Sequence, residues 1–405
     1  MSEWIEKSLG EVTSYIAKGI PPKYIEKLTE NAIYVLNQKC NRDFAISYES
    51  ARIHDLTKKR VADEKMLNVG DVLVNSTGEG TAGRIAQLWD IPYPTTTDGH
   101  MITLRPTEEV DPLYCGYAIK AQQALIESLA EGSTGQTEIN RKRLQEEVII
   151  AFPKDKDKQN CTAKILENID KKITINNEIN RNLSEQMQAL FASVFYPEIE
   201  AGNKVSLGDY LYIKGRIGWK GLKKDEYLDE SEYRIINGES LTATGIDWAK
   251  AGYISEERYI ESPEIMLQEG DILISKDGTI GKIGYVNKLE KPTSVASGIF
   301  VVRNLKPEEV STVFIYCLLN SDYFKSFIAS RTEGSVIPHL YQKDFVTLEI
   351  PLLTQEQLNI FNGSVNPLFE LYFTNQTENI RLTALRDTLL PRLMCGELDV
   401  SDINI

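Results

Sequence analysis

Several features are scarce in this sequence. Its 405 residues include five cysteines, none in a Cys-x-x-Cys pair, and three histidines. Scattered cysteines argue against a disulfide framework or a zinc site and favour a reducing compartment. No apolar run reaches the roughly 18 residues of a membrane span, and the first residues lack the pattern of a secretory signal. We therefore expect a cytoplasmic protein with no membrane segment.

Positive charge is also in deficit. Lys and Arg number 45 against 59 Asp and Glu, a net charge of −14. This balance argues against a simple nucleic-acid binder, although a local basic patch or a cationic partner can still hold phosphates. It leaves one alternative open: an acidic interaction protein or DNA mimic that regulates a nucleic-acid enzyme. The length predicts roughly two to four domains.

No catalytic set of residues is evident. Residues 78–83 read Gly-x-Gly-x-x-Gly, but residues 84–89 run into prolines, which favours a strand hairpin over a dinucleotide-binding helix. Residues 366–369 differ at one position from the Asn-Pro-Pro-aromatic signature of amino-directed DNA methyltransferases, and no cofactor strand accompanies them. The histidines lack metal-ligand spacing. We expect no catalytic residue, no bound cofactor and no metal in this chain.

The sequence does contain a long internal repeat. Residues 67–76 recur as residues 267–276, and both copies continue into a glycine-rich turn. Three further landmarks recur in the same order, with a separation that drifts by only about four residues. They pair 8–11 with 206–209, 98–99 with 297–298, and 131–133 with 333–335. The chain is therefore predicted to contain two similar folding units.

Each copy has the same predicted plan, which places the protein in the α+β class. Mixed strands and turns come first, followed by a helical stretch at 111–130 or 308–330. A short strand closed by proline follows at 148–153 or 346–351. Each copy then ends in a long helix, at about 159–195 and 355–394.

The two long helices carry a heptad pattern. Apolar residues alternate at spacings of three and four, as in the seam of a coiled coil. Each seam has two asparagines at its middle, Asn176 with Asn180 and Asn375 with Asn379. A buried seam asparagine fixes register at a cost in stability, so the matching pairs predict that the helices pair with each other. The alternative is that each helix lies on its own domain.

Basic residues gather in a few short segments. The densest spans 214–224, where glycines allow close approach and cations neutralise phosphates. Weaker clusters lie in the first copy, and the alternative for all of them is a solvated loop. The candidate DNA-binding residues are Lys214, Arg216, Trp219, Lys220, Lys223, Lys224, Lys18, Lys23, Lys58, Lys59 and Arg60.

The order of these landmarks resembles the specificity (S) subunit of type I restriction–modification systems. The matching stretches are 214–227, the Gly-Asp-Ile-Leu-Ile-Ser strand at 270–275, the Ile-Pro followed by Gln-Glu-Gln at 350–357, and the ending 385–398. The resemblance implies two target recognition domains, at 1–158 and 198–354, each reading one half of a bipartite, asymmetric DNA sequence. It implies helical spacers at 159–197 and 355–405 that form an antiparallel coiled coil, with internal two-fold pseudosymmetry.

The resemblance also implies partners. Methyltransferase (M) subunits, two of them, would dock on the helices and carry S-adenosylmethionine and the methylation chemistry. Restriction (R) subunits, with ATP and Mg, would join for cleavage. This chain itself is then a non-catalytic subunit that binds double-stranded DNA and no cofactor.

Overall fold

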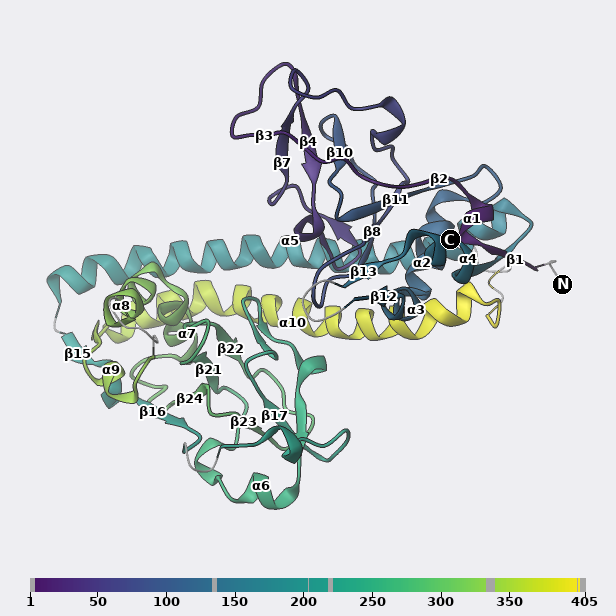
Figure 1. The fold of residues 1–405 in the computed structure, drawn as a ribbon. Coiled ribbons are helices and arrows are strands. Elements are labelled where there is room, and N and C mark those ends of the chain that lie inside the picture. The colour runs from purple at the N-terminus through teal and green to yellow at the C-terminus, as the bar shows by residue number, and fades with distance from the viewer. Residues whose placement is uncertain are drawn as a thin grey trace. The chain divides into compact units, whose positions relative to one another are not determined.

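A computed structural model describes residues 4–132, 137–202, 204–217, 221–332, 339–398 and 400. The chain forms two compact units (Figure 1). Unit 1 contains Met1–Ile175 and Asn379–Ile405, and unit 2 contains Asn176–Glu378. Unit 1 is therefore discontinuous in sequence, because the end of the chain completes it.

Two sheets build most of unit 1. An antiparallel sheet has the order β2-β11-β8-β9, and a second sheet has the order β10-β4-β7-β3 with β10 parallel to β4. Strand β1 (Trp4–Ser8) pairs with β14 (Ile149–Pro153). The strands of the two sheets are β2 (Thr13–Lys18), β11 (Met101–Pro106), β8 (Val72–Asn75), β9 (Ile85–Gln87), β10 (Thr95–Thr97), β4 (Ala32–Leu36), β7 (Arg52–Asp55) and β3 (Tyr24–Ile25).

The expected hairpin at residues 78–83 is confirmed by the antiparallel pairing of β8 with β9. Gly78, Gly80 and Gly83 in the connecting turn have φ angles of 110°, 66° and 87°. Glycine alone adopts such angles without steric cost, so the motif serves the turn. Short paired strands also occur in this unit: β5 (Asn41–Arg42), β6 (Ala45–Ile46), β12 (Ala130–Glu131) and β13 (Glu138–Ile139).

Helices pack with these strands in a shared hydrophobic core. The helical stretch expected at 111–130 is two helices that meet at Gln122. Tyr114, Phe152 and Leu166 are fully buried in one core with Leu393 from the end of the chain. The helices of unit 1 are α1 (Leu9–Val12), α2 (Pro112–Ala121), α3 (Gln123–Ser128), α4 (Arg141–Glu147), the first part of α5 (Lys156–Ala201) and the last part of α10 (Gln355–Met394).

Unit 2 repeats this design. Its antiparallel sheet has the order β16-β24-β21-β22, and its three-stranded sheet has the order β20-β17-β23 with β17 parallel to β23. Strand β15 (Lys204–Ser206) pairs with β25 (Glu349–Pro351) as β1 does with β14. The strands are β16 (Leu211–Gly215), β24 (Ile299–Asn304), β21 (Ile272–Ser275), β22 (Ile283–Tyr285), β20 (Gly252–Ile254), β17 (Tyr233–Ile236), β23 (Thr293–Val295), β18 (Leu241–Thr242) and β19 (Gly245–Ile246). Its helices are α6 (Glu256–Ile260), α7 (Thr312–Asn320), α8 (Asp322–Thr332), α9 (Gln342–Val346), the last part of α5 and the first part of α10 (Gln355–Met394).

One ion pair is duplicated in detail. Arg105 on β11 donates from Nε and Nη2 to the two carboxylate oxygens of Asp71, both at 2.8 Å, and from Nη2 to the Met66 carbonyl at 2.9 Å. Bidentate pairs of this kind fix geometry as well as adding energy. Arg303, Asp271 and Met266 form the same set in unit 2, at 2.7, 2.8 and 3.0 Å. The predicted repeat is thus confirmed in the α+β fold and in its side chains.

The two long helices, teal α5 and yellow α10 in Figure 1, pack together. In unit 2, Gln357 donates to Glu198 at 2.5 Å, and Asn375 donates to Asn180 at 2.9 Å. Residue numbers therefore rise along one helix as they fall along the other, which makes the pairing antiparallel. Within unit 1, Arg386 contacts Asp170 at 2.9 Å. The predicted pairing of the helices is confirmed.

The seam asparagines behave differently from one another. Asn176, Asn180 and Asn375 are buried, whereas Asn379 is partly exposed. Asn180 accepts from Asn375 and donates to the Tyr372 carbonyl at 3.0 Å. Asn176 donates to the carboxylate of Glu378 at 2.7 Å. The Asn180–Asn375 contact thus forms a polar layer between the helices. An apolar residue facing either asparagine would leave a hydrogen bond unmade, so the layer fixes the register of the pair.

The helix bounds differ from the expected ones at α5. This helix runs from Lys156 to Ala201 and continues through Pro197, where the sequence pattern favours an end. Phe195 is fully buried and stacks with Phe191, which holds the last turns against the unit 2 core. The compact units also divide both helices, whereas the expected segments kept each helix whole. The helix ends belong to the cores of the globular parts.

Candidate nucleic-acid interface

In unit 1, the structure brings two of the expected basic segments together. The buried imidazole of His54 accepts from the Lys23 backbone N–H at 2.7 Å and contacts the Lys59 carbonyl through Nε2 at 2.7 Å. The Asp55 N–H donates to the Lys23 carbonyl at 3.0 Å. This histidine is a structural group that joins two loops. The side chains gathered at this edge of β3 and β7 are exposed: Lys23, Lys58, Lys59 and Arg60.

Lys18 does not join this edge. It ends β2, is ion-paired with Glu138, and its side chain is about one-third exposed. Burial and the nearby Arg141 lower its pKa. The ammonium group already has a carboxylate partner, which makes it a weaker candidate for a phosphate than Lys23, Lys59 and Arg60. Lys58 also has a carboxylate partner, Asp55, at 3.8 Å.

Beside that edge lies a groove of about 650 Å³ that sequence reasoning missed. Arg52 lies over the ring of Tyr24, with its guanidinium carbon 4.8 Å from the ring centroid. Asn37, Gln38 and Lys39 form another part of the lining, together with His100. These residues form no charge cluster in the sequence, because they come from separate strand ends. A stacked arginine with amide and imidazole groups is suited to contacting base edges.

Asp98 lies at the buried side of the groove. Its carboxylate accepts from the His100 N–H at 2.9 Å, and burial raises its pKa. A carboxylate there opposes the approach of phosphate and restricts the groove to groups that tolerate a nearby negative charge.

In unit 2, the cations of the basic segment 214–224 have different surroundings. Lys214 on β16 is partly buried, with its Nζ 5.9 Å from the Tyr212 ring centroid. Lys223 and Lys224 are exposed, and the Lys223 N–H donates to Glu226 at 2.7 Å. Trp219 and Lys220 lie outside the described residues. The loop therefore presents two of its cations next to acidic side chains.

The structure corrects the expected DNA contact of Arg216. Its side chain is 2 % exposed. The guanidinium donates to the Val295 carbonyl at 3.2 Å and to the hydroxyls of Ser262 and Ser294, both at 3.4 Å. Burial and the nearby Arg258 lower its pKa. Arg216 satisfies polar groups inside the unit and does not face a ligand on its surface.

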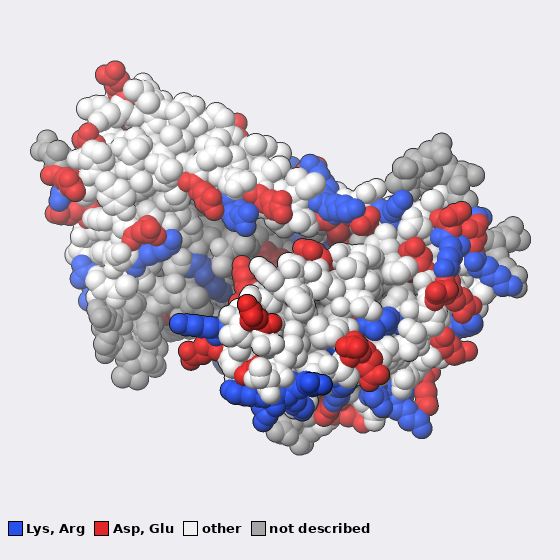
Figure 2. Space-filling view, turned by 90° about the horizontal axis from the view of Figure 1, so that it is seen from above, with Lys and Arg blue, Asp and Glu red and all other residues white. Residues whose placement is uncertain are grey.

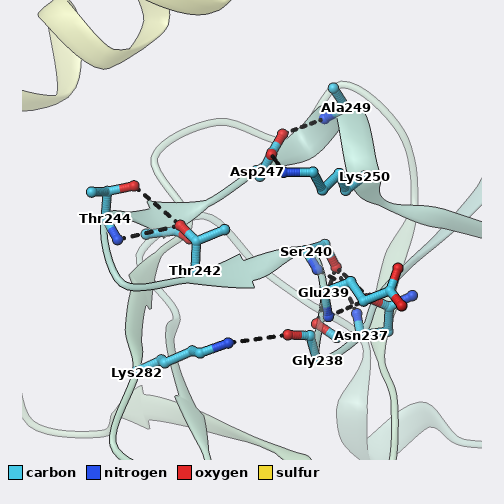
Figure 3. Close-up of polar contacts among 11 residues, drawn as sticks. Asn237, Gly238, Glu239, Ser240, Thr242, Thr244, Asp247, Ala249, Lys250 and Lys282 are labelled. Carbon is cyan, nitrogen blue, oxygen red and sulfur yellow. Dashed lines mark hydrogen bonds and ion pairs between the residues drawn. The ribbon is translucent and has the colours of Figure 1, made fainter. Parts of the chain in front are cut away.

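A matching turn follows the first long strand of the second sheet in each unit. Asn37 accepts from the Lys39 N–H at 2.9 Å. Asn237 accepts from the Glu239 N–H at 2.9 Å and the Ser240 N–H at 3.0 Å, as Figure 3 shows. Asparagine caps such turns because its short side chain reaches the backbone two residues on. The same asparagine-capped turn therefore occurs in both copies.

One face of the molecule is mixed in charge. Basic and acidic side chains are interspersed over the face drawn in Figure 2, which shows no continuous basic patch. Within the described residues, no group of three or more His, Cys, Asp or Glu side chains is placed to hold a metal. No helix of the described chain is long and apolar enough to cross a bilayer.

Comparison with known proteins agrees with this architecture. Residues 1–185 and 203–363 both match the type I restriction modification DNA specificity domain. The MjaVIII and MjaIX specificity subunits of type I restriction enzymes from Methanocaldococcus jannaschii are 22% and 24% identical to this chain. Both alignments cover 99% of the chain, with 94% and 95% of the relatives. A solved type I restriction-modification S subunit from M. genitalium shares the fold, with a TM-score of 0.57, 21% identity, and coverage of 97% and 96%.

Proposed function

This chain belongs to the family of type I restriction modification DNA specificity domains, and we propose that it is the DNA-recognition subunit of a type I restriction–modification complex. Each globular part reads one half of a bipartite, asymmetric target in double-stranded DNA. The observation that carries the proposal is the duplication of one reader fold with different side chains on equivalent surfaces. Two similar but unequal readers suit an interrupted target with unequal halves.

The paired helices set the distance between the half-sites in this proposal. Each of α5 and α10 contributes to both compact units. A helix rises about 1.5 Å per residue, so the length of the helix pair fixes a distance that is comparable to one turn of DNA. The helices also offer the docking surface for two methyltransferase subunits, and restriction subunits join for cleavage.

The chemistry belongs to those partners in this proposal. S-adenosylmethionine is carried by the methyltransferase, and ATP with Mg by the restriction subunit. This chain contributes selection of the site and no catalytic group. Membership of the specificity family favours this function over the acidic interaction protein or DNA mimic that the net charge left open.

The net negative charge of the chain bears on how DNA is held. We expect the isolated chain to bind DNA weakly, because the partners supply many of the phosphate contacts. Binding is measured over a range of salt concentrations with and without the methyltransferase subunits. The complex should bind its target tightly, and the double variant Lys59→Ala, Arg60→Ala should flatten its log–log salt slope by roughly 2.

A matched control is Lys325→Ala at an exposed site on α8, which should leave the slope unchanged. Tight, sequence-specific binding by the isolated chain would contradict the shared-contact proposal. A DNA mimic would instead compete with DNA for the methyltransferase and form no ternary complex.

A further inference from the structure

We propose that Lys39 in unit 1 and Glu239 in unit 2 occupy one equivalent reading position, and that each determines base preference in its own half of the target. The inference rests on the proposed function and deepens it, because it names specificity-determining residues in both readers. Their side chains have opposite charge, so the two half-sites must offer opposite hydrogen-bonding groups there.

The equivalence rests on the local fold. Each residue is second after a capping asparagine, Asn37 or Asn237, which follows a strand that pairs in parallel with its neighbour. The residue after it is fully buried in both units, Cys40 in one and Ser240 in the other. A short hairpin comes next, β5–β6 or β18–β19. The same turn is therefore built twice.

Both turns are also tied at the same backbone atom. The Gln38 carbonyl accepts from the side-chain amide of Asn75 at 3.1 Å. The Gly238 carbonyl accepts from the Lys282 ammonium at 3.2 Å, as Figure 3 shows. In each unit the donor comes from the hairpin of the main sheet, β8–β9 or β21–β22. A turn fixed at this point presents its next side chain from a defined place.

The side chains at this position are available to a ligand. Lys39 and Glu239 are both exposed. Lys39 lines the groove of about 650 Å³ beside Arg52, which is stacked on Tyr24. In unit 1, the reading position thus adjoins a groove whose other residues can contact bases.

The chemistry of the two residues predicts different preferences. An ammonium group only donates, so Lys39 suits the O6 and N7 acceptors of guanine. A carboxylate only accepts, and phosphates repel it, so Glu239 suits the amino group of cytosine. Both preferences are for a G·C pair, which unit 1 contacts at guanine and unit 2 contacts at cytosine.

The test selects binding sites from random double-stranded DNA with the full complex of this chain and its methyltransferase subunits. Glu239→Gln should shift one position of a single half-site from cytosine toward adenine, roughly 10-fold in preference, since glutamine pairs with adenine. Lys39→Glu should change one position in the other half-site and leave the first half unchanged. Lys325→Gln and Glu308→Gln, at exposed sites away from the turns and from α5 and α10, are the matched controls.

Both side chains are exposed, so each variant should fold. Thermal melting of each variant checks this. Folded variants that select the wild-type sequence in both halves overturn the inference and leave the proposed function intact. A wild-type complex that selects no sequence at all overturns the proposed function. Variants that change both halves together also overturn the assignment of one position to each reader.

Discussion

At the scale of single residues, the structure separates cations that face outward from those that support the fold. Lys23 and Lys59 belong to loops that His54 joins, and their side chains are exposed. Arg216 has the same charge but is buried among Val295, Ser262 and Ser294. The density of positive charge along the sequence identifies both exposed and buried cations. It cannot separate them, because the packing of distant strands decides whether a side chain faces solvent.

Replacing Arg216 with Met should destabilise the protein. The change leaves the Val295 carbonyl without its donor, at a cost of about 1–3 kcal/mol. We expect a lower midpoint in urea denaturation and an unchanged salt slope of DNA binding by the folded complex. Lys224→Met, at an exposed site nearby, is the control and should not change the midpoint. A stable variant with a flatter salt slope would instead return Arg216 to the DNA interface.

Asp98→Asn should relieve the burial of a charge. Burial raises the pKa of Asp98 above its unfolded value, so its contribution to stability is most favourable below the unfolded pKa and is lost as pH rises through the folded pKa. The amide can still accept from the His100 N–H. Melting at pH 7 should therefore occur at a higher temperature than in wild type, with a smaller difference at pH 4. Glu108→Gln, at an exposed site, is the control, and a lower melting temperature at pH 7 would contradict this account.

At the scale of elements, the sequence predicts best where one pattern is long. The heptad seam locates α10 at Gln355–Met394, since its apolar spacing persists for many turns. It predicts the end of α5 poorly, because buried Phe195 holds a helix that Pro197 should terminate. The break at Gln122 between α2 and α3 has no local signal.

The site was less predictable than the elements. The repeat indicates where two readers lie, but Arg52, Tyr24 and His100 meet in a groove only through the sheet topology. Comparing the two copies residue by residue would have found Asn37 and Asn237. The charged residues that follow these asparagines, Lys39 and Glu239, differ between the copies, so a search for shared residues does not find that position.

The Asn180–Asn375 pair should couple the two helices. Asn375→Leu leaves the Asn180 side chain without a donor it now has, which should cost about 1–3 kcal/mol. Asn180→Leu together with Asn375→Leu should recover much of this loss, because an apolar pair can pack without unmet hydrogen bonds. Urea denaturation of the single and double variants measures the coupling. Additive effects of the two changes would show that the asparagines do not act as a pair.

At the scale of the whole molecule, one chain carries two copies of a reader and two helices that each enter both compact units. The copies retain the Arg–Asp pair that braces the main sheet, Arg105 with Asp71 and Arg303 with Asp271. They differ in the exposed groups around it. Such a chain can keep its scaffold constant while each reader changes independently.

Shortening the helices should change the gap in the target. Removing one heptad from α5 and the facing heptad from α10 takes about 10 Å from the helix pair. We expect the preferred gap between half-sites to change by about three base pairs, since base pairs stack about 3.4 Å apart. Site selection with the shortened chain measures this, and both half-site sequences should stay the same. An unchanged gap would contradict the spacer role.

The most direct measurement maps the methylated adenines in cells that produce this chain with its methyltransferase subunits. We expect one motif with two unequal half-sites at a constant separation, joined by base pairs of any sequence. A continuous motif, a symmetric motif with equal halves, or methylation without sequence preference would contradict it.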